Sequence, residues 1–347
     1  MKYSSYYITG ATGFLGREIL RELLSRSAVV HAFVMKDDPL IGEIENEAVL
    51  HYGDITDYAS LESFLSGTGE KSCVIHSAGM VSVATRPGKE LWRINVEGTE
   101  NVVRAAVKAK AGKFVYVSSV HAMAGKPGGR EIEALPEAFN PDFVKGGYAK
   151  TKAAATNAVL RAADKGLDAS IVFPSGIIGP GDEGMGSISS MLLSFLSGKL
   201  PFAVRGGYDF VDVRDVAYGI VSAAENGRKG GCYILSGHYA TIRDILETIG
   251  ENTSTRRKVS YIPLALAKII APFYELDSIR RKKKLFFTPY SVSVLGSNAL
   301  FSRKSSVREL GYCPRSLAET LLDTVTWLGK KITGTEEKKK RRKHSRF

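Results

Sequence analysis

Short apolar runs alternate with longer segments of helical periodicity through the first two thirds of the chain. The apolar runs predict β-strands at residues 6–8, 29–35, 48–53, 72–76 and 113–117. Between them, segments such as 14–24 and 90–111 repeat apolar positions every three to four residues, as amphipathic helices do. We therefore predict an α/β fold with a doubly wound parallel sheet, in which ligands bind beyond the carboxyl ends of the strands.

A glycine-spaced turn, TGATGFLG from Thr9 to Gly16, follows the first strand. Gly10 would allow the turn, Gly13 would let the backbone approach a phosphate, and Gly16 would let the next helix lie close to the sheet. Because the N-terminus of a helix attracts anions, the turn predicts a pyrophosphate cradle. Its spacing differs from the commonest dinucleotide fingerprint, so the motif alone leaves an ordinary turn open.

Charged residues follow the second and third strands. Lys36 is the first of them, at the place where such folds face the adenosine ribose, and a cation there favours NADP(H) over NAD(H). Asp37 and Asp38 follow at once, so a solvated strand end is the alternative. Asp54 and Ile55 lie where a carboxylate and an amide could bracket an adenine, although a helix cap is the alternative for Asp54.

The fourth strand ends at His76, which we expect to be a hydrogen-bonded core histidine because no second metal-binding side chain stands at a suitable spacing. We expect no metal site. Ala78 and Gly79 follow, and their small size would let a cofactor ribose pass over the backbone. In segment 90–111, Gly98 costs a helix ~1 kcal/mol relative to alanine, which predicts close packing there and a buried, hydrogen-bonded Asn95.

A tyrosine and a lysine four residues apart, Tyr148 and Lys152, begin an alanine-rich helix. This spacing places both side chains on one helix face. A nearby ammonium group favours a phenolate and lowers the pKa of a tyrosine, so the pair could transfer a proton to a carbonyl oxygen. Ser119 stands at the carboxyl end of the preceding strand, with Ser118 as its local competitor.

These motifs, in this order, resemble those of the extended short-chain dehydrogenase/reductase superfamily. The resemblance runs from about residue 6 to 328 and is closest to the branch of dihydroflavonol-4-reductase-like and 3-beta-hydroxysteroid-dehydrogenase-like enzymes, within the NAD-dependent epimerase/dehydratase type. It implies a Rossmann-type sheet with a smaller, mainly helical substrate lobe. Segment 174–182 resembles the loop that covers the nicotinamide in that family.

The resemblance implies an NAD(P)-dependent oxidoreductase that reduces a ketone or aldehyde, or oxidises the alcohol. In that family the tyrosine is the general acid/base, the lysine lowers its pKa, and the serine polarises the carbonyl; here these are Tyr148, Lys152 and Ser119. The cofactor contacts that it implies are Gly10, Thr12, Gly13, Phe14, Leu15, Lys36, Asp54, Ile55, Ala78, Gly79, Tyr148, Lys152, Pro174 and Ile177.

The substrate class is less constrained. Sugar-nucleotide epimerases of the superfamily use an arginine to hold the substrate diphosphate, and Tyr208 takes its place here. We therefore expect a small-molecule carbonyl or alcohol substrate that is bulky and apolar. Two alternatives remain: a sugar-nucleotide epimerase or dehydratase with tightly bound NAD(P), and a dinucleotide-sensing protein without catalysis.

We expect a cofactor domain at 1–240 with a lobe insertion around 180–210, a substrate lobe at 241–330, and a basic, disordered tail at 331–347. The last helix of the lobe is expected at 317–328. Segment 262–276 is apolar and five cations follow at 280–284. We interpret this as a core helix and a solvated turn; a segment at a membrane surface is the alternative.

Composition narrows the class of protein further. Of the net charge of +12, the last twelve residues contribute +5, from seven Lys/Arg and two Glu, so a nucleic-acid partner is not indicated. Three scattered cysteines indicate reduced thiols rather than disulfides. The first strand begins too early for a signal peptide, and no apolar run reaches the length of a membrane span, so we expect a cytoplasmic protein. The resemblance also suggests a homodimer.

Overall fold

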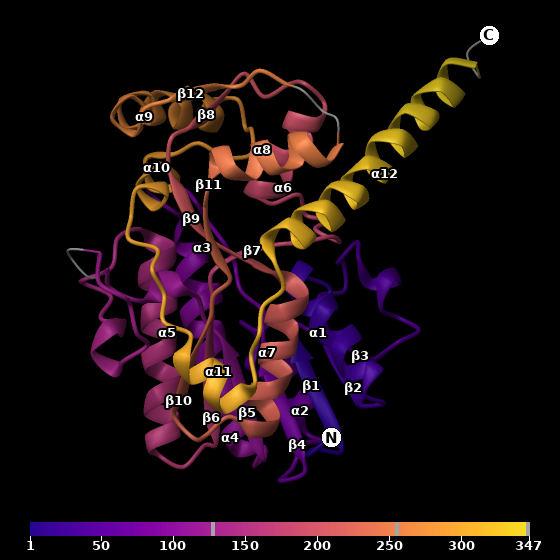
Figure 1. The fold of residues 1–347 in the computed structure, drawn as a ribbon. Helices are drawn as coiled ribbons and strands as arrows, with labels where there is room; N and C mark the ends of the chain where they lie inside the picture. Colours follow the sequence, from indigo (N-terminus) through magenta and orange to yellow (C-terminus); the bar gives the residue numbers. More distant parts are fainter. Residues whose placement is uncertain (126–128, 254–256, 345–347) are drawn as a thin grey trace.

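A seven-stranded sheet organises the larger part of the molecule in the computed structural model, which describes residues 1–125, 129–253 and 257–344 (Figure 1). The strand order is β10-β6-β5-β4-β1-β2-β3, and all neighbouring strands are parallel. This confirms the predicted doubly wound Rossmann-type sheet. The strands are β1 (Ser5–Thr9), β2 (Val29–Val34), β3 (Val49–Tyr52), β4 (Ser72–His76), β5 (Lys113–Val117), β6 (Ala169–Pro174) and β10 (Gly231–Leu235).

Helices cover both faces of this sheet, which explains why its central strands are apolar throughout rather than alternating. Strands β4, β5 and β6 are buried at every position. One face packs against α2 (Tyr58–Leu65), α4 (Thr99–Lys108) and α5 (Gly147–Asp164). The other packs against α1 (Phe14–Ser25), α7 (Val213–Asn226) and α11 (Lys304–Leu310).

A smaller lobe lies beyond one end of the large sheet (Figure 1). It contains mostly helices and two small sheets, with strand orders β11-β9-β7 and β12-β8. The lobe resembles the expected one, but α11 leaves it and packs against α7 and β10. Its elements are β7 (Gly176–Ile178), α6 (Ser187–Leu196), β8 (Phe202–Val204), β9 (Gly207–Asp212), β11 (His238–Thr241), α8 (Ile242–Thr253), β12 (Ser260–Ile262), α9 (Leu264–Arg280), α10 (Pro289–Leu295) and the start of α12 (Leu317–His344).

The helix expected at 90–111 is not continuous. It consists of α3 (Lys89–Trp92), a wider π-helical turn (Arg93–Gly98) and α4. The close packing predicted at Gly98 is confirmed, because a Cβ there would lie 2.8 Å from Cδ1 of Ile55. π-Helical turns often occur at functional sites, and this one carries Asn95.

Two expectations about the C-terminal third are wrong. The final helix does not end at residue 328 but continues as α12 to His344, so most of the tail expected to be disordered is helical, in keeping with the high helix propensity of Lys, Arg and Glu. The last three residues of that tail lie outside the described part of the chain. The apolar segment expected to be a core helix is α9, which is largely exposed. Among the described helices, none has both the length and the apolar character to cross a bilayer.

Candidate active site

The glycine turn forms a tight loop between β1 and α1. Gly10 has a φ of +76°, and a Cβ on it would lie 2.7 Å from the backbone nitrogen of Ala78. A Cβ on Gly16 would lie 1.9 Å from the carbonyl oxygen of Gly10. Gly13 caps α1 without a side-chain hydrogen bond and is exposed. The amide donors at the start of α1 therefore have no side-chain cap, which suits a phosphate.

A buried arginine that the sequence analysis missed supports this loop. Arg17 donates through Nη1 to the carbonyl oxygen of Thr12 at 2.9 Å and through Nη2 to that of Gly181. It therefore ties the glycine loop to the segment that the family resemblance assigns to the nicotinamide. In that segment Pro174 is buried at the end of β6, and Ile177 is half-buried in β7. The sequence contained a signal for this role of Arg17. An arginine in the first turn of a helix, next to its apolar face, can be buried only with hydrogen-bond partners.

The end of β2 brings an acid, Asp38, to the glycine loop. Thr12 Oγ1 donates to Asp38 Oδ2 at 2.6 Å, and Asp38 Oδ1 accepts from the backbone of Leu40 at 2.9 Å. Lys36 is exposed. The carboxylate is thus held at the loop by two hydrogen bonds, while the side chain of Lys36 extends into solvent.

The end of β3 is ordered by local hydrogen bonds. Asp54 Oδ1 accepts from the backbone and the hydroxyl of Thr56, at 2.8 and 2.9 Å, whereas the cap of α2 is Asp57. The helix-cap alternative for Asp54 is therefore wrong. Ile55 is buried against Gly98, and its carbonyl oxygen accepts from Asn101 at 3.2 Å.

The predictions for His76 and Asn95 are confirmed. His76 is fully buried between the hydroxyls of Thr9 and Thr99, at 2.7 and 3.0 Å, so it is a core residue. Asn95 accepts from the backbone of Met80 at 2.7 Å and donates back to it at 2.9 Å.

Asn95 also connects the loop after β4, which it bonds at Met80, to helix α5, because its side chain donates to Thr151 Oγ1 at 3.1 Å. A Cβ on Gly79 would lie 3.3 Å from Asn95 Oδ1 and 4.0 Å from Lys152 Nζ. Gly79 therefore lies beside the predicted catalytic lysine, whereas the backbone of Ala78 lies against Gly10, on a loop that Asn95 holds at Met80.

The structure brings Ser119, Tyr148 and Lys152 to the carboxyl end of β5. The hydroxyl of Ser119 lies close enough to the phenol of Tyr148 to affect its pKa, and it accepts from the backbone nitrogen of His121 at 3.3 Å. Ser118 instead bonds Thr156 Oγ1 at 2.8 Å inside α5, so the geometry favours Ser119 over its competitor. Lys152 Nζ donates to the carbonyl oxygen of Val117 at 2.7 Å.

The pKa of Tyr148 departs from the expected direction. Burial raises the pKa of the phenol to about 12, and the neighbouring hydroxyl of Ser119 offsets only part of the rise. Burial also lowers the pKa of Lys152 to about 7. The expected lowering of the Tyr148 pKa by Lys152 is not found, because Lys152 Nζ is bound to Val117 and lies 4.6 Å from the ring centroid of Tyr116.

Three further rings surround Tyr148. His121 contacts it edge-on, with ring centroids 5.9 Å apart, and stacks on Tyr208 at 5.6 Å with an interplanar angle of 10°. The hydroxyl of Tyr290 lies 3.3 Å from His121 Nδ1, and that of Tyr208 lies 3.5 Å from Nε2. We call His121, Tyr208 and Tyr290 the aromatic wall.

The wall is electrically neutral near pH 7. Burial lowers the pKa of His121 to about 4 and raises the pKa values of Tyr208 and Tyr290 well above their usual value. Of the three, Tyr208 is evident from the sequence as a departure from epimerases, and the other two were not predicted. His121, two residues after Ser119, carried a local signal; Tyr290 did not, because it comes from α10 in the other lobe.

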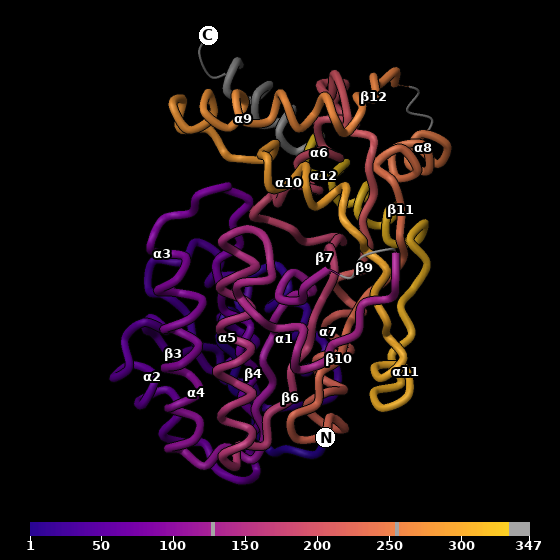
Figure 2. The backbone as a smooth tube through the Cα atoms, turned by 90° about the vertical axis from the view of Figure 1, so that its left-hand side faces the viewer, coloured from indigo at the N-terminus to yellow at the C-terminus, as the bar shows by residue number. Residues whose placement is uncertain are grey.

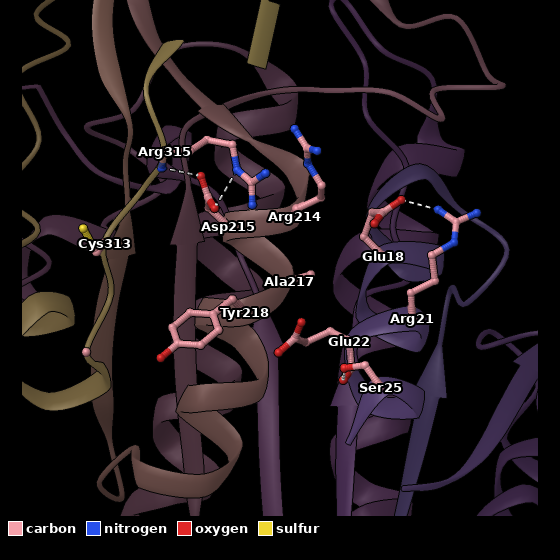
Figure 3. Close-up of a pocket in the computed structure, with 11 residues that line it drawn as sticks. Glu18, Arg21, Glu22, Ser25, Arg214, Asp215, Ala217, Tyr218, Cys313 and Arg315 are labelled. Carbon is pink, nitrogen blue, oxygen red and sulfur yellow. Dashed lines mark hydrogen bonds and ion pairs between the residues drawn. The ribbon is translucent and has the colours of Figure 1, made fainter. Parts of the chain in front are cut away.

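A separate surface pocket of about 550 Å³ lies between α1 and α7 (Figure 3). Its charged groups are engaged in ion pairs: Arg315 Nε lies 3.0 Å from Asp215 Oδ1, Arg21 pairs with Glu18, and Glu22 and Arg214 pair with residues beside the pocket. None of the residues predicted for catalysis or cofactor binding lines it. The pocket therefore has no part in the candidate site.

Comparisons with known proteins agree with this arrangement. The model of the NAD dependent epimerase/dehydratase family matches residues 6–236. Sterol demethylase protein B of Methylococcus capsulatus is 32% identical over 92% of this chain and 97% of its own length. A 4-hydroxy-2-methyl-3-oxo-4-farnesyl-3,4-dihydroquinoline-1-oxide ketoreductase of Stigmatella aurantiaca is 28% identical over 93% of this chain and 96% of its own. The structure of UDP-glucose 4-epimerase from Thermotoga maritima has a TM-score of 0.76 at 19% identity, covering 94% of this chain and 99% of that one, and supports the fold alone.

Proposed function

This chain belongs to the NAD dependent epimerase/dehydratase family and is an NAD(P)-dependent oxidoreductase, and we propose that its substrate is a bulky, largely apolar ketone or the corresponding secondary alcohol. The aromatic wall beside Tyr148 is the observation that carries this proposal. A neutral wall of rings offers no cation to a diphosphate, whereas it suits an apolar ring system.

The proposed roles follow from the contacts of each residue. Tyr148 transfers the proton at the substrate oxygen, and Ser119, whose hydroxyl lies beside Tyr148, donates to the same oxygen. Lys152, with its ammonium group held by Val117, supplies positive charge beside the loop at Gly79. The nicotinamide cofactor, when bound, supplies or accepts the hydride.

The cofactor site fits a dinucleotide. The uncapped N-terminus of α1 and the bare backbone at Gly10 and Gly13 accommodate a pyrophosphate. Lys36 would attract a 2′-phosphate, while Asp38, held at Thr12, would repel it. We therefore propose a modest preference for NADP(H), which substitution of Asp38 by Asn would increase.

Two relatives support the substrate class. Their names give a sterol for one and a farnesyl-bearing ketone for the other, both bulky and apolar. The family also contains epimerases, but the replacement of a diphosphate-binding arginine by Tyr208 disfavours a sugar nucleotide here. A homodimer and a cytoplasmic location stay predictions.

The test is a cofactor titration followed by a substrate panel. Absorbance of the purified protein first shows whether nucleotide is already bound, and fluorescence then gives the Kd values for NADPH and NADH. We expect exchangeable binding and turnover of a sterol or prenylated ketone, but not of UDP-glucose. Nucleotide that does not exchange, together with conversion of UDP-glucose, would overturn the proposal in favour of an epimerase.

The Tyr148→Phe variant is the matched control for the panel, since it keeps the ring and its contact with His121. If the wild type and this variant both bind the cofactors and neither converts any substrate of the panel, the result would favour a dinucleotide-sensing protein.

A further inference from the structure

Helix α9 presents its large apolar side chains to solvent and its small side chains to the protein. Its buried positions are Ala267, Ala271, Glu275 and Ser278, which repeat every three to four residues and so form one face. By contrast, Ile269, Phe273 and Leu276 are 65%, 71% and 65% exposed. The other exposed large side chains of the helix are Leu266, Ile270, Tyr274 and Ile279.

Specific contacts fix this orientation. Glu275 accepts from the backbone nitrogen and the hydroxyl of Thr85, at 2.8 and 2.7 Å. Ala267 and Ala271 pack in a small core with Val204 and Val292. Turning the apolar side chains inward would break both hydrogen bonds of Glu275 and remove Ala267 and Ala271 from this core. The apolar face is therefore a fixed feature of the surface.

A cluster of cations adjoins this face. Arg280 and Arg281 end the helix, and Lys282, Lys283 and Lys284 follow; all five are exposed. Arg281 pairs with Asp277 at 2.7 Å, and Lys284 donates to the carbonyl oxygens of Gly184 and Met185. The net charge of this end of the helix is thus strongly positive.

The position of α9 leaves its outer side accessible. It lies along the outer edge of the smaller lobe, away from the large sheet, in both views (Figures 1 and 2). Its inner side contacts α10 and the segment around Thr85. The outer side of α9 is therefore open to solvent.

We propose that α9 binds the surface of an anionic lipid bilayer. The side chains of Ile269, Phe273 and Leu276 enter the boundary between headgroups and acyl chains, and the cations at 280–283 contact acidic headgroups. A run of exposed apolar residues next to exposed cations matches the two attractions that hold helices in that interface. The proposal concerns binding alone and does not depend on the proposed reaction.

A second copy of the chain fits this face less well. An α-helix of 17 residues is about 25 Å long and about 10 Å wide, so its footprint is about 250 Å². A stable dimer buries about 800 Å² on each partner. Parallel pairing through α9 would also bring the two clusters of cations together.

Vesicle co-sedimentation tests the proposal on the full chain. The probes are vesicles of phosphatidylcholine alone and of phosphatidylcholine with 30% phosphatidylserine, each at low and high salt. We expect binding to the anionic vesicles that falls with salt, because exposed charges are screened. The double variant Ile269→Ser/Phe273→Ser should reduce the partition coefficient at least tenfold. Lys282→Gln/Lys283→Gln should reduce it about fivefold for each charge removed.

Phe143→Ser is the matched control, because Phe143 is 70% exposed and lies outside α9. It should bind vesicles like the wild type. Unchanged cofactor affinity and melting temperature would show that the α9 variants are folded. The proposal would be overturned if the wild type did not bind anionic vesicles. It would also be overturned if Phe143→Ser lost as much vesicle binding as the α9 variants. Concentration-dependent dimerisation that Phe273→Ser abolishes, without vesicle binding, would assign the face to a second copy instead.

Discussion

The two glycines of the cofactor loop should respond in opposite ways to the same added methyl group. In Gly16→Ala the new Cβ would lie 1.9 Å from the carbonyl oxygen of Gly10, so the backbone must move. In Gly13→Ala the nearest atom is that same oxygen at 3.3 Å, and the φ of −66° suits alanine. The first change should damage the fold, and the second should block the cradle.

The expected magnitudes follow from these distances. Overpacking costs about 1–3 kcal/mol or more, and contact with backbone belongs at the upper end, so Gly16→Ala should lower Tm by at least about 5 °C. Gly13→Ala should change the free energy of unfolding by less than about 1 kcal/mol. Because its methyl group stands on the exposed side of the loop, it should weaken NAD(P)H binding at least about tenfold, or about 1.4 kcal/mol.

Thermal unfolding and fluorescence titration measure both quantities on the same samples. Gly42→Ala is the control, since a Cβ there would meet no atom within 4 Å. It should leave Tm and cofactor affinity unchanged. Wild-type cofactor affinity in Gly13→Ala would refute the assignment of this loop as the phosphate cradle.

Three further outcomes are expected. Burial lowers the pKa of Lys152 to about 7, so its positive charge is present below that pH and lost above it. We therefore expect kcat/KM for carbonyl reduction to fall about fivefold from pH 7 to pH 8. A flat pH profile of the wild type would contradict this role of Lys152. Tyr290→Phe removes the hydroxyl that lies 3.3 Å from His121 Nδ1. It should lower kcat/KM for the apolar substrate about fivefold and leave the cofactor Kd unchanged. A change in the cofactor Kd alone would show that Tyr290 does not line the substrate site. Lys36→Ala should weaken NADPH binding about fivefold without affecting NADH binding, whereas Asp38→Asn should strengthen NADPH binding. Titration of each variant with both cofactors measures these effects. Equal changes in the Kd values for NADPH and NADH would show that Lys36 and Asp38 do not lie at the 2′-phosphate.

Local patterns predicted the large sheet well. Strands β4 and β5 have the expected bounds, because buried parallel strands are continuous apolar runs that end at polar or small residues. The packing of Gly98 and the burial of Asn95 also followed from local chemistry. In each case the information lay within a few residues of the feature itself.

The errors arose where distant segments meet. The apolar composition of α9 suggested a core helix, but its orientation is set by Glu275 and by Thr85, 190 residues earlier in the chain. Likewise Tyr290 reaches His121 from the other lobe. The pKa of Tyr148 depends on its burial, which no spacing along the helix reveals. Long-range contacts of this kind are not encoded in periodicity.

The role of Tyr148 as the proton donor and acceptor of an oxidoreductase reaction is tested most directly by the turnover of Tyr148→Phe beside its affinity for NADPH. We predict a loss of kcat of at least about 100-fold, because a positioned acid or base contributes that much, with a cofactor Kd within about threefold of the wild type. Full turnover by the variant would contradict the role given to Tyr148.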